Sequence, residues 1–276
     1  MSAHVGEIVI EAGHGERRYW SDLWMYRGLL YFLAWRDILV RYKQTVIGIA
    51  WAVIQPLLLM VILTIVFSRL AKLPSGGAPY PLLVFSGLLP WFFFSQAFSN
   101  ASNSLIGNAN MVSKVYFPRM IVPLSAVVVC LVDFAIAFAL LLLLALLLGA
   151  LPDWRIVALP AFLALAFVTA LGAGLWMAAL NVKYRDFRYV VPFLVQIGMY
   201  ISPVGFNSNL VPEKWRMLYA MNPMVGVIDG FRWSLLGGNI DLYVPGLVLS
   251  VVLSTLLLVS GVRFFRRTER RFADLI

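Results

Sequence analysis

The sequence contains very few of the residues on which metal and redox chemistry depends. Its 276 residues include one cysteine, Cys130, and two histidines, His4 and His14. A single cysteine excludes an internal disulfide, and the apolar run around Cys130 is typical of an inert packing residue. Both histidines fall within residues 1–18, which we expect to form a flexible cytoplasmic tail, so the sequence offers no cluster of metal ligands.

Motifs for phosphate binding and catalysis are also missing. The sequence has no Gly-Lys dipeptide and therefore no Walker-type phosphate loop. The few ionisable groups inside apolar stretches form neither a proton relay nor a nucleophile–base pair. We therefore expect neither an enzyme nor a proton-coupled carrier, and what remains is a conduit that takes its energy from another protein.

Charged residues are scarce, at 13% of the chain against 62% hydrophobic residues, and they are concentrated in a few short segments. A soluble domain of this length could not keep the long uncharged runs in solution. The pattern predicts an all-α, polytopic integral membrane protein whose single transmembrane domain covers residues 19–262. We expect six transmembrane helices at about 45–68, 82–105, 121–149, 156–180, 190–202 and 242–262.

Four segments outside these spans have their own signatures. Residues 19–38 combine Trp and Tyr at helical spacing with charges, which predicts an N-terminal interfacial helix. Segment 106–118 is either a plain loop or a short helix on the membrane face, presented to another subunit. Residues 212–236 form two apolar segments split by a proline, each about half the length of a crossing, which predicts two external re-entrant half-helices. Residues 263–276 are expected to be a basic cytoplasmic tail.

The positions of lysine and arginine predict the orientation. Six spans place both termini on one side, where most of the 22 basic residues fall; Arg232 is among the few on the opposite side. By the positive-inside rule the termini and segment 106–118 are cytoplasmic. The net charge of +9 therefore reflects topology, and we expect no nucleic-acid partner.

Several residues inside the spans are unusual for a lipid environment. Asp133 lies within the third span, where a carboxyl group costs about 2.5–3.5 kcal/mol on insertion scales. We expect it to be hydrogen-bonded between helices, because no other acid or base lies in the central part of a span to form a relay with it. Ala170, Gly174 and Ala178 recur every fourth residue and predict close helix packing. The second half of the second span is rich in Ser and Asn, which must face partner helices, water or a pathway.

A polar stripe begins the first span. Gln44, Gly48, Trp51 and Gln55 are spaced by four, three and four residues, which places them on one face of a helix directly after a basic lead-in.

This stripe belongs to RYKQTVIGIAWAVIQPLL, the first of six informative stretches. The others, in chain order, are SGLLPWFFFS, NANMVSKVYFPR, ALNVKYRDFRYVVPFLVQ, YISPV and MNPMVGVIDGFRW. Together they resemble the permease subunit of type-2 ABC exporters for polysaccharides. The O-antigen (lipopolysaccharide) branch is the most similar, capsule and teichoic-acid permeases are similar to it, and the resemblance covers nearly the whole chain after Tyr19.

The resemblance implies a homodimer in the bacterial inner membrane that works with two copies of a separate ATPase on the cytoplasmic face. ATP and Mg are expected on that ATPase, with no cofactor in this chain. The polymer is implied to travel on a polyprenyl pyrophosphate lipid, and the half-helices to cap the outer end of the channel. Segment 106–118 becomes the ATPase-coupling helix, with its contacts at Asn108, Met111, Val112, Lys114, Val115 and Tyr116.

Two hypotheses about the site follow. Arg36, Arg41 and Lys43 form a cytoplasmic entrance that recognises the pyrophosphate, although anchoring by the positive-inside effect alone would also explain them. The conduit is expected to be lined by amides, a hydroxyl and aromatic rings, which suit the hydroxyls and C–H faces of a sugar chain. The expected lining residues are Gln44, Trp51, Gln55, Trp91, Ser95, Gln96, Gln196 and Tyr200.

Three rival functions remain open. The nearest is an ABC exporter of the same fold that carries a capsule polymer, teichoic acid or a small molecule. A membrane-embedded glycosyl or acyl transferase would need an acidic or histidine cluster at an interface, which we do not find. A passive channel would work without an ATPase.

Overall fold

The computed structural model describes residues 15–43, 46–184, 186–237, 240, 242–269 and 272. Within these residues all the regular secondary structure is helical and there is no strand, which confirms the expected all-α class. The α-helices are α1 (Gly15–Met25), α2 (Arg27–Lys43), α3 (Val46–Thr64), α4 (Tyr80–Gly107), α5 (Ala109–Lys114), α6 (Ile121–Leu147), α7 (Leu159–Lys183), α8 (Phe187–Ile201), α9 (Glu213–Tyr219), α10 (Pro223–Leu236) and α11 (Val244–Glu269).

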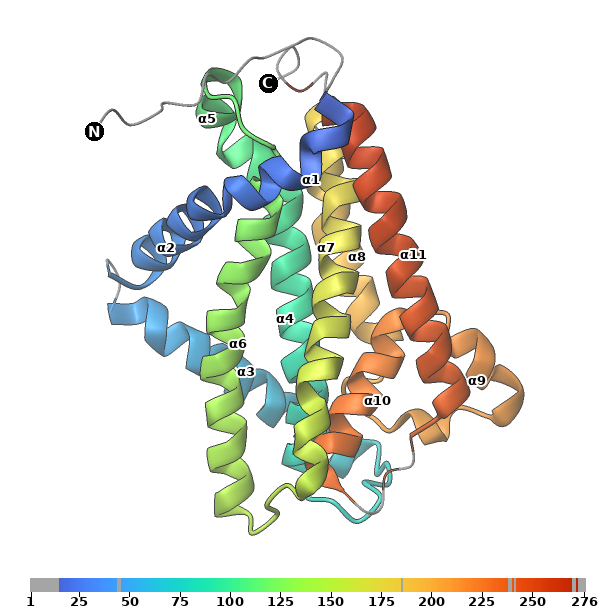
Figure 1. Cartoon of the computed structure of the whole chain (residues 1–276). Coiled ribbons are helices and arrows are strands. Elements are labelled where there is room, and N and C mark those ends of the chain that lie inside the picture. The colour runs from blue at the N-terminus through green and yellow to red at the C-terminus, as the bar shows by residue number, and fades with distance from the viewer. Residues whose placement is uncertain are drawn as a thin grey trace.

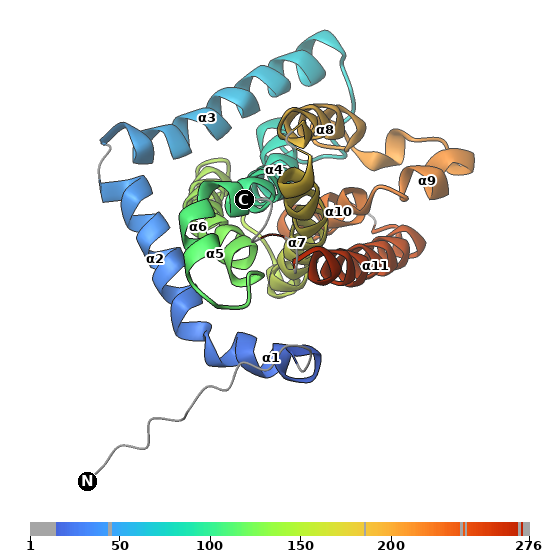
Figure 2. The same ribbon diagram turned by 90° about the horizontal axis from the view of Figure 1, so that it is seen from above.

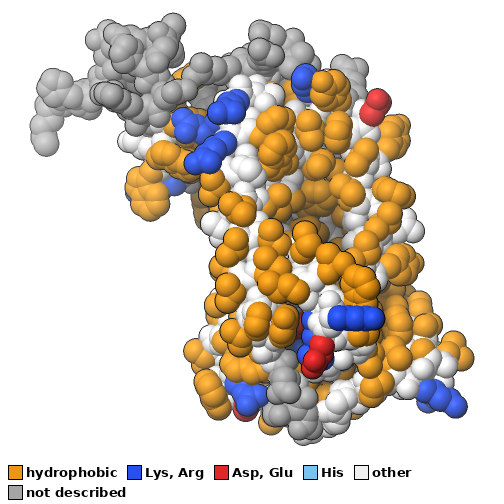
Figure 3. Space-filling view, turned by 90° about the vertical axis from the view of Figure 1, so that its right-hand side faces the viewer, with side chains coloured by type: hydrophobic (Ala, Val, Ile, Leu, Met, Phe, Trp, Pro, Cys, Tyr) orange, Lys and Arg blue, Asp and Glu red, His pale blue; other side chains and the backbone are white. Residues whose placement is uncertain are grey.

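Five helical segments are long and apolar enough to cross a membrane: 53–70, 80–107, 121–147, 154–183 and 244–269. The first joins the end of α3 to a π-helical segment, Ile65–Leu70, and the fourth joins a 3-10 turn, Trp154–Ala158, to α7. Helix α8 is apolar but only 15 residues long. The multi-pass membrane class is therefore confirmed. In a side view, hydrophobic side chains cover the middle of the molecule, and Lys and Arg lie toward its two ends (Figure 3).

The structure differs from the expected boundaries mainly at the two ends of the chain. The expected single interfacial helix is two helices, α1 and α2, separated by a turn at Tyr26. Helix α11 continues to Glu269, so the beginning of the expected C-terminal tail extends the last helix. The reason is that Arg263 to Glu269 keep the helical register of the apolar run, and arginines are good helix formers.

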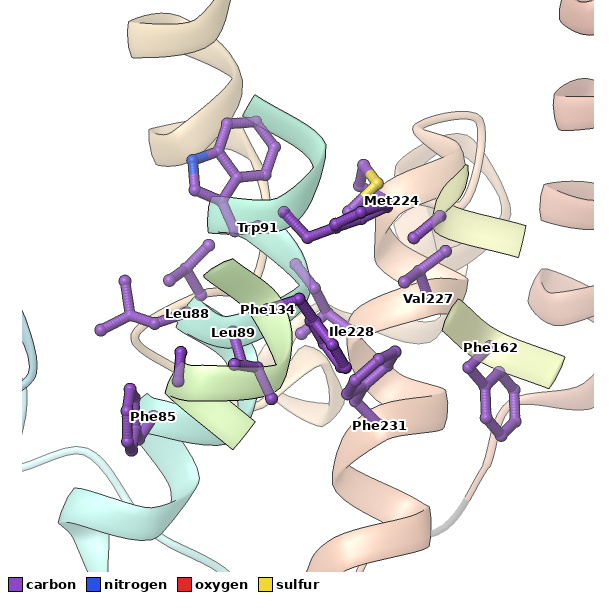
Figure 4. Packing of buried hydrophobic residues seen from close by; sticks show 14 of the residues in the cluster. Phe85, Leu88, Leu89, Trp91, Phe134, Phe162, Met224, Val227, Ile228 and Phe231 are labelled. Carbon is purple, nitrogen blue, oxygen red and sulfur yellow. The ribbon is translucent and has the colours of Figure 1, made fainter. Parts of the chain in front are cut away.

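Helix α4 is the centre of the bundle. It packs against α6, α7 and α10, and the chain continues as a helix through Pro90. Its buried side chains Phe85, Leu88 and Leu89 meet Phe134 of α6 and Phe231 of α10 in the main apolar cluster (Figure 4). Seen from above, α1, α2 and α3 run around the outside of this bundle (Figure 2).

Small residues allow the central helices to approach closely, as predicted. Ala170, Gly174 and Ala178 are buried. A Cβ atom added to Gly174 would lie 2.6 Å from Cβ of Ala101 on α4, which shows that this face of α7 packs on α4. On another face of α7, a Cβ atom at Gly172 would lie 2.7 Å from the backbone nitrogen of Leu258 on α11.

The polar half of α4 faces partner helices and its own backbone. The Ser102 hydroxyl donates to the carbonyl of Phe98, 2.6 Å away, one turn earlier. Asn181 of α7 donates to the Ser102 carbonyl at 2.8 Å, and Asn100 donates to the Cys130 thiol of α6 at 3.3 Å. The sequence left it open whether these residues face partner helices, water or a pathway. The hydrogen bonds of Ser102 and Asn100 support contact with partner helices.

Candidate functional site

The three basic residues of the expected entrance all lie on α2, which in Figure 1 lies between α5 and α3. Arg36 and Lys43 are seven residues apart and so share a face of the helix. Lys43 is exposed at the last position of α2. Arg41 is turned toward α6, so the structure divides the three residues between two environments.

Asp133 of α6 receives two bonds from the end of α2. The Arg41 guanidinium donates through Nη1 to Oδ2 of Asp133, and the Tyr42 hydroxyl donates to Oδ1. The side chain of Asp133 is 15% exposed and that of Arg41 is 36% exposed. The expected hydrogen bond between helices is thus present, and its partners are Arg41 and Tyr42, more than ninety positions away along the chain.

Arg36 connects α2 with the start of the coupling segment. Its Nη2 donates to Oδ1 of Asn108 at 3.0 Å, and its Nε donates to Asp37 at 2.8 Å. Asn108 is the residue that joins α4 to α5. The expected entrance and the expected coupling segment, which are far apart in the sequence, are therefore in direct contact.

The expected coupling segment contains a short helix, α5, which spans only Ala109–Lys114 of the expected 106–118. Val112 is 1% exposed and anchors α5 in a second apolar cluster, with Leu33 of α2, Leu105 of α4 and Phe265 of α11. Met111 is partly buried against the same cluster. Lys114, Val115 and Tyr116 are exposed beyond it, so the segment has an anchored side and a presented side.

A partly buried polar junction, which the sequence analysis missed, joins α1, α11 and the segment before α6 at this end of the molecule. Glu269 at the end of α11 accepts a hydrogen bond from the Tyr19 hydroxyl of α1 at 3.0 Å and one from the backbone N–H of Arg119 at 2.7 Å. The Arg119 guanidinium in turn donates to the Glu269 carbonyl at 2.5 Å. Burial raises the pKa of the Tyr19 phenol above its ordinary value, and the Glu269 carboxylate beside it raises that pKa further.

The expected conduit residues fall into two groups. Gln55 of α3, Gln196 and Tyr200 of α8 are exposed, and Gln96 of α4 is half-buried. Gln44 and the side chain of Trp51 lie outside the described part of the chain.

Trp91 and Ser95 of α4 are buried inside the protomer. Trp91 is 3% exposed, and its ring lies so close to α8 that a Cβ atom at Gly198 would be 2.7 Å from it. The Ser95 hydroxyl donates to the Phe92 carbonyl at 3.1 Å, within its own helix. Both residues therefore serve packing in this structure, and the sequence could not show this because α8 lies about a hundred residues away.

Helix α8 carries a longer exposed stripe than the sequence analysis named. Tyr189, Phe193, Gln196 and Tyr200 follow one another at spacings of four, three and four, and all four are exposed. Val191 on the opposite side of the helix is buried, and α8 packs on α4 and α7. The stripe therefore points away from the bundle.

The opposite end of the molecule contains a buried charged residue that the sequence analysis had counted among the basic residues of the external side. Arg232 of α10 is fully buried. Its guanidinium donates to the carbonyls of Phe206, Val204 and Leu83 at 2.6, 2.8 and 3.2 Å. Asp229, one turn earlier, is also buried. Arg232 thus fastens α10 to α4 and to the segment after α8, and it does not report on membrane orientation.

Comparison with known proteins agrees with this architecture. The family model of the ABC-2 type transporter matches residues 28–236. The chain is 28% identical to the O-antigen export system permease protein RfbA of Myxococcus xanthus, over 92% of this chain and 98% of that protein. It is 22% identical to the polysialic acid transport protein KpsM of Escherichia coli, over 75% of this chain and 80% of that protein. It is also 27% identical to the inner membrane transport permease YadH of Escherichia coli (strain K12), over 76% of this chain and 86% of that protein.

The family match extends from the start of α2 to the end of α10 and so includes the entrance, the coupling segment and the buried Arg232. The chain therefore belongs to the ABC-2 type transporter family and is a membrane-embedded permease subunit, a transport component and not an enzyme.

Proposed function

We propose that this permease exports a polyprenyl-pyrophosphate-linked polysaccharide of the O-antigen type across the bacterial inner membrane. The observation that carries the proposal is the similarity to the RfbA permease, which extends over 92% of this chain and 98% of that protein. The shorter match to the polysialic acid transport protein makes a capsule polymer the second candidate.

The topology we propose has six crossings: the five long helical segments and α8. At about 1.5 Å per residue, the 15 residues of α8 cover about 22 Å, somewhat less than the hydrocarbon core of about 30 Å. Both termini and α5 then lie on the cytoplasmic side, together with Lys114 and Arg119, in agreement with the positive-inside rule. Residues 19–262 form one transmembrane domain, preceded by the tail 1–18 and followed by the basic segment 263–276.

Helices α9 and α10 are proposed to be the two external re-entrant half-helices. α10 has 14 residues, and most of them are buried against α4, α7 and α11. A half-length helix is tolerated at membrane depth when protein surrounds it. The buried guanidinium of Arg232 supports this reading, because it satisfies three backbone carbonyls that lipid could not.

The ATPase is proposed to dock on α5. Two copies of the ATPase, which bind ATP and Mg, would push on the exposed residues Lys114, Val115 and Tyr116 of each protomer. Val112 would then pass the motion into the apolar cluster that joins α2, α4 and α11. Asn108 gives this motion a second route, because Arg36 of the entrance donates to it.

The entrance is proposed to be the end of α2, where Arg36, Arg41 and Lys43 recognise the pyrophosphate. Guanidinium groups match phosphate oxygens through paired N–H donors. Replacing Arg41 and Lys43 together by Gln is expected to stop export while the complex with the ATPase still assembles. Normal export by this variant would show that the charges only anchor the helix.

The conduit is proposed to lie between the protomers of a homodimer. The exposed stripe on α8, with Gln196 and Tyr200, and Gln55 on the largely uncovered α3 would form its wall. Gln96 and the undescribed Gln44 and Trp51 remain in this proposed lining, whereas the buried Trp91 and Ser95 are left out.

Thiol labelling tests this wall. In a Cys130→Ala background, cysteines at Gln196 and Tyr200 are expected to react with a water-soluble thiol reagent. Cysteines at Val248 and Leu256, which are exposed apolar positions on α11, are the matched lipid-facing controls. Equal labelling of both pairs would contradict the proposed wall.

The function itself is tested with the partner ATPase. The chain, co-expressed with an ABC ATPase and reconstituted into proteoliposomes, is expected to bind the ATPase and to show ATP turnover that rises with lipid-linked O-antigen. Turnover that responds to capsule polymer alone would favour the second candidate. Transport without any ATPase would show a passive channel.

A further inference from the structure

We propose that Asp133 is a resident counter-ion that holds Arg41 between transport cycles, and that the pyrophosphate of the substrate displaces it. This inference rests on the proposed function, because it gives Arg41 two successive anionic partners, the Asp133 carboxylate and then a phosphate. It assigns a role to an intramembrane acid that the transport proposal otherwise leaves unused.

The geometry makes an exchange feasible. Both carboxylate oxygens of Asp133 accept a bond from α2, one from Arg41 and the other from Tyr42. The two sides of the ion pair are unequally covered, since 36% of the Arg41 side chain is exposed but only 15% of the Asp133 side chain. An anion can therefore reach the guanidinium, which has five N–H donors, while Asp133 stays behind it.

Electrostatics favours the exchange in the direction we propose. Asp133 lies 12 residues into α6, about 18 Å from its start, where an unpaired carboxylate is costly. Arg41 removes part of this cost in the resting state. A pyrophosphate carries more negative charge than one carboxylate and matches the guanidinium fork. When it takes Arg41, Asp133 keeps the hydrogen bond from Tyr42, so the carboxylate is not left without a donor.

The exchange would change how α2 is held. Arg41 is two residues before the end of α2 at Lys43, so the pair fastens this end of α2 to α6. Transfer of Arg41 to the substrate loosens this fastening at the end of α2, ahead of the first crossing. Arg36, on the same helix, bonds to Asn108 beside α5. Substrate recognition and the coupling segment are therefore joined through α2.

The test measures binding of farnesyl pyrophosphate, with farnesol as the control for the lipid tail. The full-length permease is reconstituted in nanodiscs, and the Kd is measured for each variant. Asp133→Asn removes the competing anion and is expected to bind farnesyl pyrophosphate about tenfold more tightly than the wild type, the factor that about 1.4 kcal/mol represents. Arg41→Gln is expected to weaken binding about tenfold or more, and Asp133→Asn is expected to have no effect once Arg41 is replaced. Farnesol binding should stay unchanged in all of them.

Two controls make the outcome decisive. Asp22→Asn removes an acid from α1 and is expected to leave the Kd unchanged. Tyr42→Phe keeps every charge but removes the second donor to Asp133; the carboxylate then holds Arg41 more firmly, and binding should weaken about two- to threefold. If Asp133→Asn does not insert, Tyr42→Phe decides: weaker binding supports the exchange, whereas unchanged or tighter binding overturns it.

The same Kd measurements distinguish a wrong exchange of Arg41 partners from a wrong entrance. If Arg41→Gln weakens binding but Asp133→Asn leaves it unchanged or weakens it too, the pair is only structural, and the entrance stands without the exchange. If Arg41→Gln binds farnesyl pyrophosphate like the wild type, the proposed entrance itself is wrong.

Discussion

Replacing Arg232 by Met tests how α10 is held at the end of the molecule opposite α5. The change keeps most of the side-chain volume and removes the three hydrogen bonds to the carbonyls of Phe206, Val204 and Leu83. It also removes the positive charge next to the buried Asp229. The variant therefore deprives three carbonyls of a buried charged donor and leaves the buried Asp229 without its neighbouring positive charge.

The expected cost follows from the burial of these groups. A hydrogen bond to a charged group is worth about 1.5–3 kcal/mol, and removing one partner from a buried charged network typically costs about 3–5 kcal/mol. We take about 4 kcal/mol for Arg232→Met, because some carbonyls will find new donors. For a protein of this size that loss lowers the midpoint of thermal unfolding by roughly 10 °C.

The assay is the temperature at which half of the purified protein leaves the monodisperse peak in size-exclusion chromatography. Arg216→Met is the matched control, because Arg216 of α9 also donates to two loop carbonyls, both at 3.2 Å, but is only partly buried. It is expected to cost about 1 kcal/mol or less. The double variant with Asp229→Asn should lose less than Arg232→Met alone. A shift for Arg232→Met no larger than that for Arg216→Met would refute the reasoning.

Two further predictions concern other contacts. Gly172→Ala places a Cβ atom 2.7 Å from the backbone nitrogen of Leu258 and should destabilise the packing of α7 on α11 by about 1–3 kcal/mol. Gly107→Ala is its control and should be neutral or stabilising, because a Cβ atom there meets nothing within 4 Å. Equal melting temperatures of the two variants would contradict this prediction. Glu269→Leu removes the acceptor for Tyr19 and should release α1, seen as faster trypsin cleavage at Arg27. Thr268→Val is its control, because the Thr268 hydroxyl bonds only within α11, and identical cleavage in the two variants would show that Glu269 does not hold α1.

The helices were the most predictable part of the fold, because length and hydropathy alone determine which segments can cross a lipid core. The second expected span, 82–105, corresponds to α4 at Tyr80–Gly107, and the third, 121–149, to α6 at Ile121–Leu147. Short elements such as α5 were less predictable, since their ends depend on neighbours that are remote in the sequence.

Charged residues were harder to place than apolar ones. A count of lysine and arginine treats each residue as part of a loop, but Arg232 is fully buried because backbone carbonyls from two other segments surround it. Asp133 was correctly expected to form a hydrogen bond between helices, but the sequence analysis did not identify its partner, Arg41 of α2. In both cases the missing information is tertiary, since only the folded chain shows which donors meet which acceptors.

The residues of the candidate site could be predicted from the sequence only in part. The sequence analysis chose Gln196 and Tyr200 for the chemistry of their side chains, and the structure exposes both of them on α8. The full stripe back to Tyr189 follows from the helical period, which the sequence analysis did not apply to this segment. Exposure could not be read for Trp91, because an aromatic residue in a span suits packing, lipid and a conduit equally well until the neighbouring helix is known.

The position of α4 at the centre of the bundle has a consequence for biogenesis. α4 is the second crossing to leave the ribosome and the least apolar of the five long segments, yet 78% of its most apolar stretch ends up buried inside the protein. The helices that bury it, α6, α7 and α10, are synthesised later, and Asn181 at the end of α7 supplies a donor to the Ser102 carbonyl. We therefore expect nascent α4 to remain beside the translocon or a membrane chaperone until α7 and then α10, which ends at Leu236, have emerged, so that this permease inserts in a concerted way and not helix by helix.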